Sequence, residues 1–256
     1  MNTNIAFLLL SCDKYYEMID PFAELMDRFW GDCKWPKFAA TNVRPYNGRG
    51  FTPILAGEDS SWSGGLKKIL LDLKEQNFEY VFITLEDLFL KAPVDNAQIE
   101  AITKEFLKLE GNYIRFYTHK TPSNKVNEYF AKIAKGTPYR HNCVYAMWKI
   151  ETLLEILKDD ENAWDFEKIA VKRSDKYDGF YTVNKSQFKI LNTLIKGKWV
   201  PYDYRYAKRL LPNLKIEKPM MSRMDELKLN LKRGAFLMVH CAPTFISKRF
   251  IKLNRF

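Results

Sequence analysis

The stretch YVFITLEDLFLKAP, residues 80–93, decides the fold class of this chain. Residues 80–85 form an apolar run rich in β-branched and aromatic side chains, which is typical of a buried strand. Two adjacent carboxylates, Glu86 and Asp87, end the run abruptly. Acids at the carboxyl end of a buried strand lie where open α/β sheets bind ligands. A charged turn that simply stops a strand gives the same pattern, so the segment alone leaves both interpretations open.

Strands and helices are predicted to alternate on both sides of this segment. Apolar runs predict strands at residues 5–10, 36–41, 80–85, 113–117 and 141–149. Apolar spacing of three and four predicts helices at residues 16–29, 95–109, 151–158 and in SSWSGGLKKILLDLKEQ, which Ser61 or Ser63 can cap. We expect a loop at residues 42–58, and strands with turns at Asn184 and Gly197 in residues 178–202. The alternation predicts a mostly parallel α/β sheet flanked by helices.

The positive charge lies in the last quarter of the chain. The 256 residues carry a net charge of +10, whereas residues 189–256 alone carry +12 and residues 1–188 carry −2. We therefore expect a catalytic domain at residues 1–188 and a basic, mainly helical extension at residues 189–256 packed on it. Nucleic acid is not expected as a partner because the sequence contains no nucleic-acid-binding motif. An anionic membrane surface is the other candidate partner for such a charge.

Several classes of protein are not expected. The apolar run at residues 5–10 is far too short to span a bilayer and lacks the flanks of a signal peptide, so we expect an intracellular protein. The four cysteines are scattered without CxxC or Cys/His ligand spacing, which predicts reduced core thiols rather than a zinc site. The sequence also contains no GxSxG, Walker A or GxGxxG motif.

The order of a strand, a loop, a helix of the SWSGGLKK type and a strand ending in Glu-Asp resembles the nucleotide-sugar half of GT-A glycosyltransferases. The closest likeness is to bacterial enzymes that build capsule, lipopolysaccharide or other surface glycans, and it covers roughly residues 3–185. The resemblance implies a nucleotide-sugar half at about residues 1–118 and an acceptor half at residues 119–188. It also implies transfer of a sugar from a nucleotide-sugar donor to a glycan or lipid-linked acceptor, with inversion.

The resemblance implies a donor site. The loop after the first strand, in LLLSCDKY, faces the nucleotide base, and the acid motif after the later strand holds the metal and diphosphate. Asp87 is the first candidate for contact with Mg²⁺ or Mn²⁺ and Glu86 the second, because hard cations prefer oxygen ligands. Leu85-Glu86-Asp87 replaces the usual Asp-x-Asp, which leaves metal dependence open. The donor-binding candidates are Ser11, Asp13, Tyr15, Trp62, Ser63, Lys67, Glu86 and Asp87.

The resemblance implies a catalytic base in AWDFE, residues 163–167. In an inverting reaction a carboxylate removes the proton from the acceptor hydroxyl, and Glu167 and Asp165 are the candidates. If Asn162 is an N-cap, Asp165 occupies the third helical position and serves the helix terminus, which favours Glu167 as the base. The acceptor-binding candidates are Trp164, Arg140 and His141.

The end of the chain, FISKRFIKLNRF, has the pattern of a basic amphipathic helix. Apolar residues fall at i, i+4 and i+7 with basic residues between them, so residues 245–256 can lie on an anionic membrane or pack on the catalytic domain. With a lipid-linked acceptor we expect a cytoplasmic protein, peripheral on the inner face of the cell membrane.

Two other functions compete with glycosyl transfer. A sugar-nucleotide nucleotidyltransferase needs a Gly-rich phosphate loop soon after the first strand, and LLLSCDKYYEMIDP has no glycine. A non-enzymatic protein that binds glycan or an anionic surface through its basic end would not bind nucleotide. Nucleotide binding therefore separates the enzymatic from the non-enzymatic interpretation.

Overall fold

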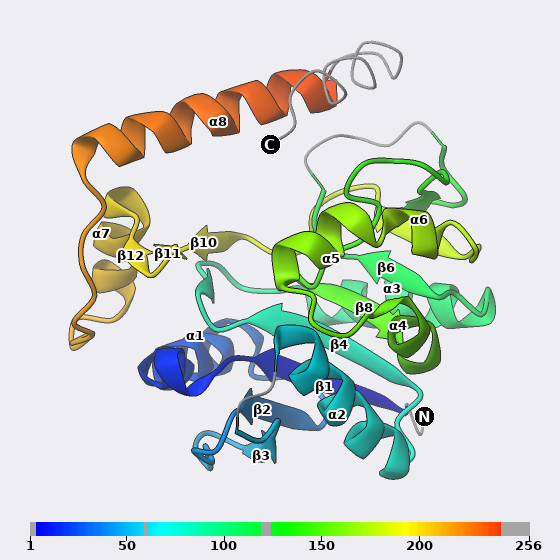
Figure 1. Ribbon diagram of the computed structural model, residues 1–256, viewed down its shortest axis with the longest axis horizontal. Helices are drawn as coiled ribbons and strands as arrows, with labels where there is room; N and C mark the ends of the chain where they lie inside the picture. Colours follow the sequence, from blue (N-terminus) through cyan, green and yellow to red (C-terminus); the bar gives the residue numbers. More distant parts are fainter. Residues whose placement is uncertain (1–3, 59–60, 119–123, 242–256) are drawn as a thin grey trace.

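A central sheet of eight strands organises the protein (Figure 1). The computed structural model describes residues 4–58, 61–118 and 124–241. In the last helix it describes side chains as far as Leu231. The strand order is β3-β2-β1-β4-β8-β6-β9-β7. All strands except β8 and β7 run in one direction, so the predicted mostly parallel α/β sheet is confirmed. The strands are β1 (Ile5–Leu10), β2 (Lys37–Thr41), β3 (Phe51–Leu55), β4 (Tyr80–Leu85), β6 (Tyr113–Arg115), β7 (Phe130–Lys132), β8 (Ala146–Lys149) and β9 (Phe180–Val183).

Two sequence predictions for this sheet were wrong. The predicted loop at residues 42–58 contains β3, which pairs in parallel with β2 at the edge of the sheet. The strand predicted for residues 141–149 begins only at Ala146 and runs antiparallel between β4 and β6. The turn predicted at Gly197 is confirmed, because Lys196 and Gly197 have φ angles of 52° and 73° between the short strands β11 (Leu194–Ile195) and β12 (Lys198–Trp199).

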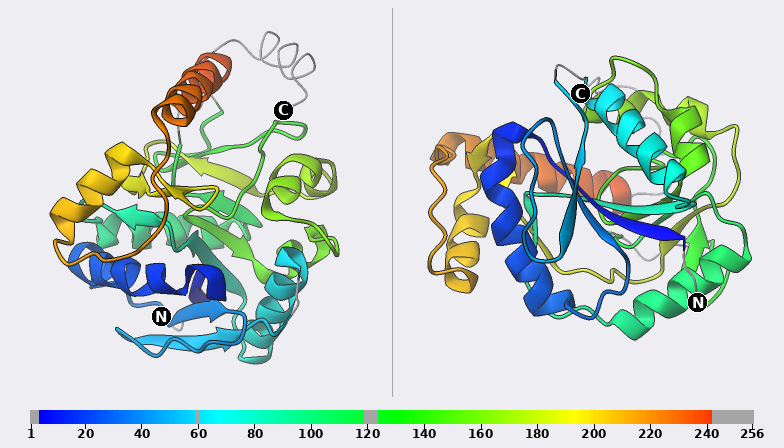
Figure 2. Two further views of the ribbon diagram at one scale, coloured as in Figure 1. Left: turned by 60° about the vertical axis from the view of Figure 1, so that its left-hand side comes forward. Right: turned by 90° about the horizontal axis from the view of Figure 1, so that it is seen from below.

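Helices cover both faces of the sheet (Figures 1 and 2). Side chains of α1 and α3 join the core cluster on one face, and side chains of α2, α4 and α5 join the cluster on the other. The region predicted as one helix at residues 16–29 is a 3₁₀ turn that continues into α1. The helices are η1 (Asp13–Met18), α1 (Ile19–Trp30), α2 (Trp62–Glu75), α3 (Asn96–Lys108), α4 (Ile150–Ile156), α5 (Ala163–Ile169) and α6 (Val171–Ser174).

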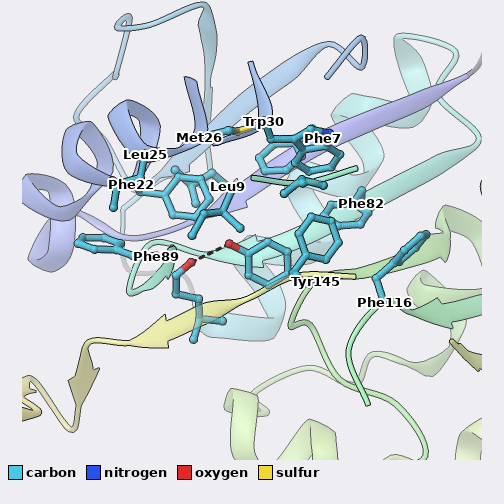
Figure 3. Packing of buried hydrophobic residues seen from close by; sticks show 14 of the residues in the cluster. Phe7, Leu9, Phe22, Leu25, Met26, Trp30, Phe82, Phe89, Phe116 and Tyr145 are labelled. Atoms are coloured by element: carbon cyan, nitrogen blue, oxygen red, sulfur yellow. Dashed lines mark hydrogen bonds between the residues drawn. The ribbon is translucent and has the colours of Figure 1, made fainter. Parts of the chain in front are cut away.

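The alternation of side chains along β4 explains why two cores form. Tyr80 and Phe82 enter one cluster, while Val81 and Ile83 enter the other, as successive strand residues point to opposite faces. Phe82 stacks on Phe7 of β1 with ring centroids 5.6 Å apart (Figure 3). Burial of such aromatic surface is the main stabilising contribution to a core of this kind.

The first part of the basic extension packs against the sheet domain. Strand β10 (Ile190–Asn192) pairs antiparallel with β5 (Leu88–Leu90), which directly follows the two acids. Helix α7 (Pro201–Leu210) lies beyond it, and Arg28 of α1 donates to the Leu210 carbonyl over 2.8 Å. Residues 189–221 thus belong to the same packed unit as residues 4–188.

Helix α8 (Arg223–Cys241) follows and lies away from the sheet in Figure 1 and in the left-hand view of Figure 2. No helix in the described part of the chain combines the length and the apolarity that crossing a bilayer requires. The amphipathic helix predicted at residues 245–256 lies outside the described residues.

Candidate functional site

The carboxyl ends of two neighbouring strands bring a serine and two acids together. We call this place, at the edge of the sheet formed by the carboxyl ends of the parallel strands, the strand-end site. Strands β1 and β4 pair in parallel with Leu10 beside Leu85, so Ser11 and Glu86 leave the sheet side by side. The Ser11 hydroxyl lies within hydrogen-bonding reach of the Glu86 carboxylate and offsets a small part of the rise that burial causes in the pKa of Glu86. The structure therefore brings together Ser11, Glu86 and Asp87, three of the residues predicted to bind the donor.

The two carboxylates are shielded from water. Glu86 is only 8% exposed, and burial, followed by the charge of Asp87, raises its pKa well above the usual range. Burial likewise raises the pKa of Asp87. The Asp87 backbone is held in place because the N–H and the hydroxyl of Thr193 donate to its carbonyl over 2.9 and 2.8 Å. Desolvated neighbouring carboxylates favour either a retained proton or a bound cation.

A tyrosine and a lysine lie next to the acids. Burial raises the pKa of Tyr15, with further contributions from Cys12, Glu86 and Asp87. The Lys218 ammonium is 5.1 Å from the centroid of the Tyr15 ring and donates to Glu17 over 2.5 Å, and its charge lowers the pKa of Glu86. Lys218 precedes α8 in the sequence, so the C-terminal extension supplies a cation to this edge.

Asp13 holds two loops together. Its carboxylate accepts hydrogen bonds from the backbone N–H groups of Asn42, Val43 and Arg44 at 2.9–3.3 Å. Its own N–H donates to the Asn42 side chain over 3.2 Å. This carboxylate therefore fixes the loop after β2 against the loop after β1, which shapes the edge of the sheet near Ser11.

The predicted donor residues of α2 contact the segment that leads into α5. Ser63 is fully buried, and its hydroxyl accepts from the Glu161 N–H over 3.0 Å. Lys67 pairs with Asp159 over 2.6 Å, and the Trp62 ring centroid lies 5.5 Å from that of Phe166. The observed contacts of these three residues thus join α2 to residues 158–166, and Ser63 has no exposed surface for a donor.

A third acid occupies a different environment on α5. Asn162 caps this helix as predicted, accepting from the backbone N–H groups of Trp164 and Asp165. The Asp165 carboxylate accepts from the Asn162 amide over 2.6 Å, whereas Trp164 is 65% exposed. Burial raises the pKa of Glu167 to about 7. A carboxylate poised near neutral pH suits a general base.

Arg140 and His141 are interior residues, which corrects their prediction as acceptor-binding residues. Arg140 is fully buried and donates to the backbone carbonyls of Ser174 and Tyr177. His141 is fully buried beside Trp148 and Phe166, and desolvation lowers its pKa to about 3, so it is neutral. Neither side chain has surface that an acceptor can touch.

Sequence reasoning missed Lys218 and Arg115. Lys218 is one basic residue among many in the extension, and only the packing of residues 189–221 brings it to the acids. Arg115 is the single charged residue in the run YIRFY, which reads as an interruption of a buried strand. That interruption could have identified Arg115 as a candidate functional residue.

The acid pair supplies carboxylate oxygens, the ligands that a divalent cation prefers, whereas the Asp13 carboxylate at the same edge is occupied by backbone N–H groups. Among the described residues, no group of three or more His, Cys, Asp and Glu side chains gathers in a way that could hold a metal ion. Mg²⁺ in nucleotide sites typically uses one or two carboxylates together with phosphate oxygens. Two adjacent, desolvated carboxylates therefore fit such an ion when a diphosphate supplies the remaining ligands.

A hollow at the opposite edge of the sheet carries no comparable chemistry. It is lined in part by Lys74, Glu79, Lys149 and Glu151. Lys74 pairs with Glu151 over 2.9 Å and Lys149 with Glu79 over 3.8 Å. These charges neutralise one another, and so the hollow offers no unpaired charge to a ligand.

Comparisons with known proteins find distant structural similarity only. No protein-family model matches it, and no curated protein matches it. The S. aureus TarS structure is 9% identical with a TM-score of 0.47 over 83% of this chain, which spans only 40% of the TarS chain. A Bacillus anthracis structure assigned as a glucose-1-phosphate thymidylyltransferase is 11% identical with a TM-score of 0.47, over 84% of this chain and 98% of the other. The A197 protein from STIV is 10% identical with a TM-score of 0.42, over 77% and 88% of the two chains. Similarity of this degree assigns neither a family nor an activity.

Proposed function

We propose that the protein is a glycosyltransferase that moves a sugar from a nucleotide-sugar donor to a glycan or lipid-linked acceptor of a bacterial surface polysaccharide, with inversion. The observation that carries the proposal is the separation of its acids into two environments. Glu86 and Asp87 form a buried pair next to Ser11, while Glu167 stands apart with a pKa of about 7. Two separate acidic sites suit a reaction that needs both diphosphate binding and a base.

In this proposal the strand-end site binds the donor. The diphosphate lies at Glu86 and Asp87, with the Lys218 ammonium balancing charge and the Tyr15 ring available to stack on the base. Mg²⁺ or Mn²⁺ held by Asp87 and Glu86 would neutralise the negative charge that the leaving diphosphate develops. Asp13 contributes indirectly because it orders the two loops around the nucleotide.

Glu167 acts as the base in this proposal. The acceptor hydroxyl oxygen attacks the anomeric carbon, the bond from that carbon to the diphosphate oxygen breaks, and the hydroxyl proton passes to the Glu167 carboxylate. Because the pKa of Glu167 is about 7, this carboxylate is ionised above neutral pH and protonated below it. The rate should therefore rise as the pH increases through about 7. Trp164, exposed beside it on α5, offers an apolar face to the acceptor sugar.

A nucleotide screen tests the donor site. We expect one of UDP, GDP, CMP or dTDP to raise the melting temperature, and Asp87→Ala to reduce that shift. Repeating the titration with Mg²⁺, Mn²⁺ or EDTA tests the metal. No shift with any nucleotide would favour the non-enzymatic alternative, and consumption of a nucleoside triphosphate with a sugar phosphate would favour nucleotidyl transfer.

A substitution of Glu167 tests the base separately. We expect Glu167→Gln to abolish sugar transfer while nucleotide binding remains as in the wild type, because the base is not needed to hold the donor. Asp165→Asn is the matched control, since that carboxylate is bonded to the Asn162 cap. Full transfer activity of Glu167→Gln would remove Glu167 from the mechanism.

A further inference from the structure

Arg115 is a half-buried arginine with few protein partners among the described residues. Its guanidinium donates one hydrogen bond, from Nη1 to the Tyr139 carbonyl over 3.1 Å. Its buried Nε has no partner, and no carboxylate of the described residues pairs with it. Two other arginines of the same region have a carboxylate nearby. The Nε of Arg140 also lacks a partner, but its other nitrogens donate to two carbonyls and it lies 3.8 Å from Asp175, and Arg173 pairs with Glu161 over 2.5 Å.

A desolvated cation without a counter-ion is costly for the folded protein. Burial lowers the pKa of Arg115, which reports that cost. A bound anion would remove it, and the planar guanidinium is the side chain best suited to grip phosphate or carboxylate through two parallel hydrogen bonds. Arg115 thus has the chemistry of an anion site that the protein itself leaves unfilled.

The position of Arg115 relates it to Glu167. Arg115 ends β6 and donates to the backbone of Tyr139, and its charge lowers the pKa of Tyr113. The charge of Glu167 raises the pKa of the same two tyrosines. Tyr139 also has a φ of 51°, a left-handed conformation that a bulky residue rarely adopts and that often occurs at functional sites.

We propose that Arg115 binds a phosphate or carboxylate group of a substrate at the Glu167 side of the protein. The assignment to a substrate rests on the proposed function, but the anion site itself does not. If the anion belongs to the acceptor, the acceptor is an acidic or phosphorylated glycan. If it belongs to the donor, the Arg115 site and the strand-end site share the diphosphate.

Titration with inorganic phosphate at constant ionic strength, followed by melting temperature, tests this site. We expect phosphate to stabilise the wild type beyond chloride, and Arg115→Gln to weaken apparent phosphate affinity about tenfold or more. Arg115→Lys, which keeps the charge and guards against a folding defect, should retain part of the effect. Arg209→Gln, an exposed arginine on α7, is the matched control. No phosphate effect in the wild type, or an equal effect in Arg115→Gln, would overturn the proposal.

The nucleotide that binds best in the screen identifies the source of the anion. Nucleotide affinity that falls in Arg115→Gln as much as phosphate affinity assigns the anion to the donor. Unchanged nucleotide affinity assigns it to the acceptor. If no nucleotide binds the wild type, the proposed function fails while the phosphate titration still decides whether the anion site exists.

Helix α8 presents an independent surface. Met224, Leu227 and Leu231 are 61%, 56% and 65% exposed. Their spacing of three and four residues places them on one face of the helix. The opposite face holds Asp225, Glu226 and Leu229, which are half-buried, and Asp225 pairs with Lys198 over 3.4 Å. The apolar face of α8 is therefore more exposed than the face that carries its acids, which is unusual for a surface helix.

Charge indicates what covers this face. Arg223 and Lys228 are exposed on either side of the apolar stripe, and residues 189–256 carry a net charge of +12. A second copy of the chain would bring the same positive charge to the contact and be repelled. An anionic bilayer would attract the basic residues and accept the apolar side chains. We infer that α8 lies on an anionic membrane surface through Met224, Leu227 and Leu231.

Co-sedimentation with vesicles tests the membrane contact. We expect the wild type to bind vesicles of phosphatidylcholine mixed with phosphatidylglycerol more tightly than pure phosphatidylcholine, and less tightly as salt increases. The double variant Leu227→Ser with Leu231→Ser should bind about tenfold more weakly or worse. Leu71→Ser, a leucine 50% exposed on α2, is the matched control. Equal binding by the double variant, or a wild type that dimerises through α8 without binding vesicles, would overturn the inference.

Discussion

The two halves of the central sheet use their polar residues in opposite ways. In the parallel half, β3-β2-β1-β4, polar residues follow the strand ends, and Ser11, Glu86 and Asp87 emerge together. In the mixed half, β8-β6-β9-β7, the segment before β8 folds into the interior and buries Arg140 and His141 completely. A polar residue at the end of a parallel strand is therefore a good candidate for a functional site. A polar residue beside an inserted antiparallel strand can instead be a buried packing residue.

The largest expected effect tests the structural role of Arg140. We predict that Arg140→Met lowers the free energy of unfolding by about 3–5 kcal/mol, because the Ser174 and Tyr177 carbonyls lose their buried donor. Urea denaturation measures the change, with Arg209→Gln as the exposed control. A loss below about 1 kcal/mol would show that the two halves do not differ in this way.

An intermediate effect is expected at the acid pair of the parallel half. The raised pKa of Glu86 means that ionising it destabilises the folded protein, so wild-type stability falls as pH rises through that pKa. We predict that Glu86→Gln removes this loss and stabilises the protein by about 1–3 kcal/mol at alkaline pH, but not at about pH 4, where the folded and unfolded carboxyls are both protonated.

Melting temperatures across a pH series check this prediction. Glu75→Gln, an exposed glutamate on α2, should follow the wild type at every pH. Equal stability of Glu86→Gln and wild type at alkaline pH would mean that ionising Glu86 does not lower the free energy of unfolding. The polar residues of the two halves would then not differ in their effect on stability.

The smallest effect is expected at Trp164. Because this side chain is 65% exposed, Trp164→Ala should change the free energy of unfolding by no more than about 0.5 kcal/mol. If Trp164 contacts the acceptor sugar, the acceptor KM should rise while nucleotide binding stays unchanged. A large loss of stability would instead make Trp164 a packing residue like His141.

Much of the parallel half could be predicted from the sequence because its signals are local. The run at β4 and the stripe of α2 each depend on spacing within a few residues, as does the cap at Asn162 in the mixed half. The direction of β8 depends on its pairing with β4 and β6, and the burial of Arg140 depends on Ser174 and Tyr177, which are more than thirty residues away. The same holds for Lys218, whose neighbour Glu17 is 201 residues distant. No local pattern records such long-range contacts.

Because β5 pairs with β10, the strand-end site can be completed only after β10 has been synthesised. The Asp87 carbonyl has no donor from Thr193, and Glu86 has no nearby Lys218, until these residues of the last quarter of the chain have left the ribosome. Non-local contacts of this kind form late in folding. A nascent or truncated chain that ends before β10 therefore exposes an unfinished acidic edge. The protein acquires its complete strand-end site only as the basic segment docks.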